Sequence, residues 1–269
     1  MKSLRRMFKD IAQYPSAIAG VVLILALVAL AVYTVIAIPY NEAIRLWRGG
    51  EEVWGDYPRL APPAWTNIFN KEKQPSTIVC NSSDSGSGVT KEVKPIDETM
   101  TDVIFTYSFD YDADVFPQEM IVFITAKFEE KGPFVSMFWI TPDGREIRLG
   151  EVTAKASETY RFNQDERLLR RLKGVAPEVA LFADPEKETP TVLKGTYQLR
   201  IDAITFEEGS DLEAKFVSYG TVHGLAGTDH RRRDLTIALL WGTPIALAFG
   251  LVAALVTTVT TMVIAAIGV

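Results

Sequence analysis

The chain has 269 residues, of which 48% are hydrophobic, and its formal net charge is −6 at pH 7. This acidic balance argues against a nucleic acid as the partner, and a single cysteine, Cys80, excludes an intrachain disulfide. The length would suit one or two soluble domains, but the hydrophobic residues are distributed too unevenly for that class of protein.

An apolar segment near the N-terminus, residues 17–38, carries no charged side chain. At about 1.5 Å per helical residue it reaches the ~30 Å thickness of a bilayer's hydrocarbon core. The basic residues in the preceding segment, 1–16, are typical of a cytoplasmic N-terminus. A cleaved signal peptide is the alternative, but the apolar run is longer than the core of a signal peptide and ends without a small-residue cleavage site. We expect an uncleaved transmembrane helix, with the residues after it outside the cell or in a periplasm.

Residues 39–98 are predicted to form an interfacial segment and a flexible loop. The first part carries aromatic residues among prolines and charges, including Trp47, Trp54, Tyr57 and Trp65. This mixture is typical of a segment at the membrane interface. Aromatic side chains packed under an outer domain would explain it equally well. Residues 71–98 are polar and include the run Ser-Ser-Asp-Ser-Gly-Ser-Gly, which predicts the flexible loop.

Residues 99–221 show the alternation of hydrophobic and polar residues that is typical of β-strands. The segment 101–111, for example, places Val103, Phe105, Tyr107 and Phe109 on one face. About six short strands with turn signals between them predict an antiparallel β-sandwich. A short helix at 163–174, capped by Asn163 and ended by Gly174, is expected to cover it.

No set of residues has the spacing of a catalytic or metal centre. The two histidines, His223 and His230, have no second His or Cys at metal-ligand spacing. Asp110, Asp112 and Asp114 lack the glycine and the bidentate glutamate that complete a Ca²⁺ loop. The chain has no Gly-rich phosphate loop. We therefore predict no catalytic residue, no metal, no cofactor and no ATP hydrolysis by this chain.

Residues 222–242 form a junction between the predicted sandwich and the last apolar segment. Gly227, Thr228 and Asp229 predict a turn whose hydroxyl and carboxylate cap the backbone N–H groups that follow. Asp234 is well placed to begin a helix.

The chain from residue 235 onwards is again uncharged. Gly242 and Pro244 predict a helix break, so we expect a short interfacial helix at 234–241 and a transmembrane helix within 243–269. Small residues at every fourth position predict a ridge that lets another helix approach closely. These residues are Ala246, Gly250, Ala254 and Thr258.

The order of these features resembles the C-type permease subunit of oligopeptide, dipeptide and nickel ABC importers. In that family a lead with His and Gly runs into Gly-Thr-Asp, then Gly-Arg-Asp, a short amphipathic helix and a helix rich in Gly, Leu and Ala. The Leu-Ala-Pro-Pro-Ala-Trp segment at 60–65 fits the Pro-rich approach to this motif. The residues that match in register are Gly227, Thr228, Asp229, Arg233, Asp234, Leu235, Gly242, Gly250, Leu251, Ala253, Ala254 and Leu255.

Three features depart from the family pattern. Arg232 stands where the family usually has glycine before Arg-Asp, and a long segment separates Pro63 from Gly227 where many members have a short connection. No segment matches the cytoplasmic coupling loop of the Glu-Ala-Ala type. We infer that the predicted sandwich is an insertion into the outer loop, and that the resemblance covers the N-terminal third of a permease core.

The expected fold class is therefore a membrane α-helical protein with an extracellular all-β domain, in which two transmembrane helices flank an antiparallel β-sandwich. The resemblance implies the N-terminal portion of a permease subunit of an ABC importer for peptides or similar small solutes, in the cell membrane. It implies as partners a second permease subunit, cytoplasmic ATPase subunits, a solute-binding protein and the lipid bilayer. The alternative is a two-helix membrane protein that presents the sandwich as a binding or adhesion module. In neither case do we expect an enzyme.

Overall fold

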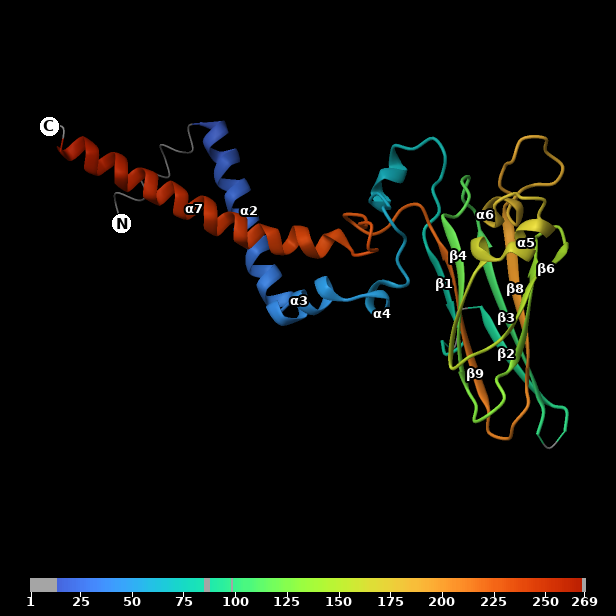
Figure 1. Cartoon of the computed structure of the whole chain (residues 1–269). Coiled ribbons are helices and arrows are strands. Elements are labelled where there is room, and N and C mark those ends of the chain that lie inside the picture. The colour runs from blue at the N-terminus through green and yellow to red at the C-terminus, as the bar shows by residue number, and fades with distance from the viewer. Residues whose placement is uncertain (1–13, 85–87, 98, 268–269) are drawn as a thin grey trace. The chain divides into compact units, whose positions relative to one another are not determined.

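The computed structural model describes residues 14–84, 88–97 and 99–267, and these divide into two units (Figure 1). The helical unit contains the described residues up to Val53 and those from Asp234 onwards. The sandwich unit runs from Trp54 to Arg233. The predicted N-terminal segment 1–16 lies largely outside the described residues.

The helical unit contains α2 (Pro15–Ala37), α3 (Tyr40–Arg48) and α7 (Leu235–Ile267). Both α2 and α7 are long and apolar enough to cross a membrane, and they contact each other. Pro15 suits the first turn of α2, where its missing N–H group would have no partner in any case. The short helix α4 (Glu51–Trp54) follows α3. The two long apolar helices expected from the sequence are therefore present.

The predicted break before Pro244 is wrong, because α7 is one continuous helix with this proline inside it. Asp234 does begin the helix as expected: its carboxylate accepts a hydrogen bond from the N–H of Thr236 at 2.8 Å. Proline removes one backbone hydrogen bond, whereas ending and restarting the helix would leave several backbone groups without partners. In an apolar environment each such group costs several kcal/mol, so a continuous helix is favoured.

Two antiparallel sheets form the sandwich unit, as the sequence predicts. The four-stranded sheet has the order β1-β9-β4-β7 and the five-stranded sheet the order β2-β3-β8-β5-β6. The bounds of the strands are β1 Ile78–Asn81, β2 Val89–Pro95, β3 Thr101–Tyr111, β4 Glu119–Lys127, β5 Phe134–Ile140, β6 Glu146–Thr153, β7 Ser157–Arg161, β8 Gly195–Thr205 and β9 Asp211–Tyr219.

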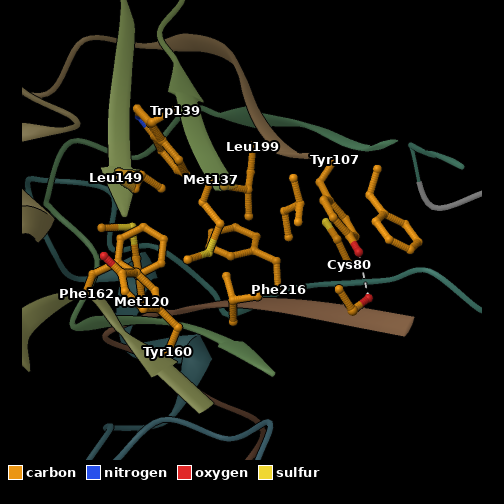
Figure 2. Close-up of a cluster of buried hydrophobic side chains, with 14 of the residues drawn as sticks. Cys80, Tyr107, Met120, Met137, Trp139, Leu149, Tyr160, Phe162, Leu199 and Phe216 are labelled. Carbon is orange, nitrogen blue, oxygen red and sulfur yellow. Dashed lines mark hydrogen bonds between the residues drawn. The ribbon is translucent and has the colours of Figure 1, made fainter. Parts of the chain in front are cut away.

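The core lies between the two sheets and is rich in aromatic side chains (Figure 2). Alternate residues of β3 and β8 face it, and their register pairs Phe105 with Ile201. Buried polar atoms of the aromatic residues have partners: the indole N–H of Trp139 donates to a backbone carbonyl at 3.1 Å, and the hydroxyl of Tyr107 does so at 2.7 Å. A buried donor without a partner would cost about 1–3 kcal/mol, so these bonds fix the positions of the rings.

The prediction of one flexible loop at 71–98 is wrong, because β1 and β2 lie within it. Cys80 in β1 is buried in the core, and burial raises the pKa of its thiol. Strand β2 is at the edge of its sheet and nearly all its side chains are exposed. An edge strand of this kind needs no alternation of hydrophobic residues, so its sequence reads as a loop. Part of the serine-rich run, residues 85–87, lies outside the described residues.

The helix expected at 163–174 is shorter and has a different cap. A 3₁₀ turn, η2 (Phe162–Gln164), precedes α5 (Glu166–Arg171), and Asp165 rather than Asn163 accepts hydrogen bonds from the first helical N–H groups. Gly174 ends the helix region as predicted, with a φ of 80° that favours glycine. Leu168 of α5 is fully buried, so this helix covers the sandwich core. A single turn, α6 (Pro177–Ala180), comes next.

Candidate functional site

Two segments that are far apart in sequence, residues 57–65 and 222–233, lie side by side in the sandwich unit, and we call this pair the clasp. Four backbone hydrogen bonds join them at 2.8 to 3.1 Å. Their donor and acceptor residues are His223 with Pro62, Ala64 with Gly224, Thr228 with Ala61, and Leu60 with Asp229. The clasp thus unites the Pro-rich segment and the Gly-Thr-Asp segment that the sequence analysis singled out, although the whole sandwich lies between them in the chain.

Thr228 is the buried centre of the clasp, with 4% of its surface exposed. Its hydroxyl donates to the carbonyl of Pro58 at 2.8 Å and accepts from the N–H of Ala61 at 3.0 Å. The hydroxyl was predicted to cap the N–H groups that follow it, and that prediction is wrong. It instead bonds across to the other segment, which no local sequence pattern indicates. A threonine hydroxyl can donate and accept at once, and both roles are used here.

Gly227 allows the two segments to approach each other. Its φ is 77°, and a Cβ atom at this position would lie 2.3 Å from the carbonyl oxygen of Ala61. Both the backbone conformation and the contact therefore exclude any other residue without a shift of the clasp.

Asp229 closes the turn as the sequence predicts. Its carboxylate accepts hydrogen bonds from the N–H groups of Arg231 at 2.8 Å and Arg233 at 2.9 Å, and its second oxygen pairs with the guanidinium of Arg233 at 2.6 Å. Burial alone would raise the pKa of Asp229, but the side-chain bond from Arg233 and the backbone bonds outweigh it. The pKa therefore lies below its ordinary value.

Arg232 takes a left-handed backbone conformation, with a φ of 66°. This is a conformation that glycine adopts without cost, and arginine needs compensation for it. The buried guanidinium provides that compensation: it donates at 2.6 Å both to the carbonyl of Tyr57 and to the carboxylate of Glu119, and it lies 4.0 Å from the ring centroid of Tyr219. Arg161 also pairs with Glu119, at 3.0 Å, so this partly buried carboxylate has two cationic partners.

Gln118 and Glu119 anchor the clasp to the sandwich, and the sequence analysis missed both. The side-chain amide of Gln118 accepts from the N–H of Arg59 at 3.0 Å and donates to the carbonyl of Arg59 at 2.8 Å. It thus makes the same pair of hydrogen bonds that a residue of a neighbouring β-strand would make. Glu119 is the first residue of β4. No local pattern could have indicated these roles, because each partner comes from a distant part of the chain.

The sequence left open whether the aromatic residues between 47 and 65 lie at a membrane interface or pack under the outer domain, and Trp54 and Trp65 differ in their burial. Trp54 is buried, with 3% of its surface exposed, and the centroid of its ring lies 5.3 Å from that of Tyr57. Trp65, in contrast, is about half exposed and lies in the 3₁₀ helix η1 (Ala64–Ile68). One tryptophan therefore packs against the clasp residue Tyr57, and the other is half exposed at the surface.

No cluster of three or more metal-ligating side chains occurs among the described residues. His223 packs its ring against Tyr57, with centroids 4.2 Å apart, and His230 is exposed. The three acidic residues noted near 110 have ordinary partners: Asp110 accepts from Thr196, Asp112 pairs with Lys73, and Asp114 pairs with Lys194. None of these residues is brought into a reactive arrangement.

The small-residue ridge of α7 is exposed along its length. No atom outside the helix's own backbone lies within 4 Å of a Cβ atom added at Gly250, although α2 contacts α7. The described residues therefore leave this part of the ridge open. Such a surface can accept the close approach of a further helix.

No family model matches the chain, and no curated protein matches it. Among solved structures, a carbohydrate-binding module in complex with β-1,4-galactotriose shares 10% identity, with 60% of this chain and 92% of that chain covered and a TM-score of 0.23. A structure from a study of carbohydrate-binding modules of the β-sandwich superfamily shares 12%, covering 60% and 61%, with a TM-score of 0.23. A structure of infectious bursal disease virus, Gx strain, shares 13%, covering 55% and 31%, with a TM-score of 0.26. These similarities are too weak to assign a function.

Proposed function

We propose that this chain is a membrane-anchored protein whose sandwich unit is presented outside the cell as a binding module, between two membrane-spanning helices. The observation that carries this proposal is that both ends of the sandwich unit meet in the clasp. A domain whose ends lie together can be inserted into a loop between two helices without disturbing either of them. The apolar, largely exposed side chains of α2 and α7 support the anchoring, because they need an apolar surrounding.

A topology experiment tests this proposal. Glu208 is exposed in the loop between β8 and β9, and the native Cys80 is buried. A membrane-impermeant maleimide added to intact cells, or to spheroplasts of a host with an outer membrane, should label Glu208→Cys and leave the wild-type chain unlabelled. Labelling of Glu208→Cys only after the cells are opened would overturn the proposal. The wild type is the matched control, since it differs only in the exposed cysteine.

A second candidate function is compatible with the first: the chain is the N-terminal portion of a permease subunit of an ABC importer for peptides or similar small solutes. The observation that favours it is the conformation of Arg232. The permease motif has glycine at this position, and Arg232 adopts the left-handed conformation that glycine prefers. The clasp supports it further, because it joins the two segments that resemble the family. The sandwich would then be an insertion in the permease's outer loop, and separate ATPase subunits would hydrolyse ATP.

Co-purification tests this second candidate. Gly250→Leu places a large side chain on the open ridge of α7, whereas Ala248→Leu places it on a different, also exposed, face of the same helix. From the native host in mild detergent, wild type and Ala248→Leu should recover a second permease subunit and an ATPase subunit, and Gly250→Leu should recover much less. Recovery of neither subunit with the wild type would count against the importer and leave the anchored module standing.

A further inference from the structure

The surface of the sandwich unit carries a compact apolar patch beside the clasp, formed by Trp65, Ile68, Phe69 and Leu225. Their exposed fractions are 51%, 79%, 78% and 74%. The rings of Trp65 and Phe69 meet edge to face at 6.3 Å, and the indole N–H of Trp65 donates to the carbonyl of Leu225 at 2.9 Å. The patch thus draws on both segments flanking the sandwich, and the ring contact and this hydrogen bond fix Trp65 against Phe69 and against the backbone of Leu225.

Large apolar side chains rarely cluster at the surface of a soluble domain unless the surface meets a partner or a membrane. We propose that this patch docks on the lipid bilayer and inserts its side chains into the interfacial layer of headgroups and upper acyl chains. This inference rests on the proposed anchoring of the chain by α2 and α7. It adds to that proposal the surface by which the sandwich unit contacts the membrane.

Chain length favours the bilayer as the occupant. Leu225 precedes the first residue of α7, Leu235, by ten positions, so even a fully extended connection spans at most about 35 Å. The hydrogen bond from Trp65 to Leu225 keeps η1 within the same range. A patch that so short a tether joins to a membrane-spanning helix meets the lipid surface at a very high effective concentration.

The chemistry of the patch also favours lipid. Tryptophan is enriched at the boundary between headgroups and acyl chains, because its ring is apolar and its N–H group is polar. The stretches 61–71 and 220–228, which contain the patch residues, have no Asp or Glu, and their only charged side chain is that of Lys71. Insertion of these two stretches therefore buries no carboxylate, and Lys71 is complementary to anionic headgroups.

The test uses the full chain reconstituted in phosphatidylcholine and phosphatidylglycerol vesicles, labelled at a single introduced cysteine with an environment-sensitive fluorophore. The native Cys80 is buried, so the unmodified chain gives the background. Ile68→Cys reports on the patch, Val256→Cys on the middle of α7, and Glu208→Cys on the end of β9 opposite the clasp. Nitroxide-labelled lipids quench only fluorophores that touch the membrane.

The proposal expects a blue-shifted emission that lipid nitroxides strongly quench at Ile68→Cys and Val256→Cys, but not at Glu208→Cys. Quenching at Val256→Cys with a water-like, unquenched signal at Ile68→Cys would overturn the docking and leave the anchoring intact. No quenching at Val256→Cys would overturn the anchoring itself. A blue-shifted but unquenched signal at Ile68→Cys would mean that protein covers the patch, which also overturns lipid docking.

A second pair of variants tests the role of the apolar side chains. Adding Phe69→Asp to the Ile68→Cys chain should abolish most of the quenching, because a carboxylate resists transfer into the interface. Val93→Asp is the matched control, since Val93 is also exposed but lies on the edge strand β2. Equal quenching in both double variants would refute the docking of this patch.

Discussion

The hydroxyl of Thr228 offers the most direct test of the clasp. Thr228→Val keeps the shape of the side chain and removes the single atom that bonds to both Pro58 and Ala61. The N–H of Ala61 and the carbonyl of Pro58 then stay buried without this partner, at a cost of about 1–3 kcal/mol for each group. Allowing for partial relaxation, we expect the sandwich unit to lose about 2–4 kcal/mol of its free energy of unfolding.

This loss is measured as a change in melting temperature of a fragment comprising residues 54–233, which is the compact sandwich unit. For a domain of this size, 1 kcal/mol corresponds to about 2–4 °C, so the melt of Thr228→Val should fall by roughly 5–15 °C. Circular dichroism of the β-signal follows the transition.

Thr191→Val is the matched control. The hydroxyl of Thr191 is buried without a hydrogen-bond partner among the described residues. Removing it should leave the melting temperature unchanged or raise it slightly, because an unpaired polar atom is replaced by a methyl group. If Thr228→Val melted within about 2 °C of the wild type, as we expect of Thr191→Val, the hydroxyl would not hold the clasp together.

Three further predictions concern the same unit. Gly227→Ala should lower the melting temperature more than Gly144→Ala, because both glycines have positive φ but only the first would clash; equal losses would show that the close approach is unimportant. Asp229→Asn should cost about 2 kcal/mol at pH 7. Since the folded-state pKa of Asp229 is depressed, that contribution is fully present above the ordinary pKa of about 4 and is lost as the pH falls from there through the folded-state pKa. The difference between wild type and variant should therefore shrink progressively as the pH is lowered below about 4; a constant difference would contradict this. The fragment 54–233 should melt cooperatively, whereas 99–220 should not, because it lacks the strands that pair with β3 and β9; a cooperative melt of the shorter fragment would refute this.

The sequence by itself determined the features that depend on local pattern. The uncharged runs predict the two apolar helices, because a bilayer-length segment without charge has few other stable settings. Alternation in segments such as 101–111 predicts the sandwich, because a strand with one buried face must alternate. The residue types of Asp234 and Gly174 predict that they lie at helix ends, since a helix cap and a left-handed turn depend on neighbouring residues alone.

Tertiary structure decided the features that depend on distant partners. Strand β2 has no hydrophobic alternation and exists because β3 offers a free edge. The backbone of Arg232 is held in a left-handed conformation by Tyr57 and Glu119, which lie far from it in the sequence. Thr228 looks like a local cap, yet its hydroxyl bonds to residues 58 and 61, which the whole sandwich separates from it in the sequence. In each case the energy that fixes the residue comes from groups that only the fold brings within bonding distance, so no window of neighbouring residues contains the information.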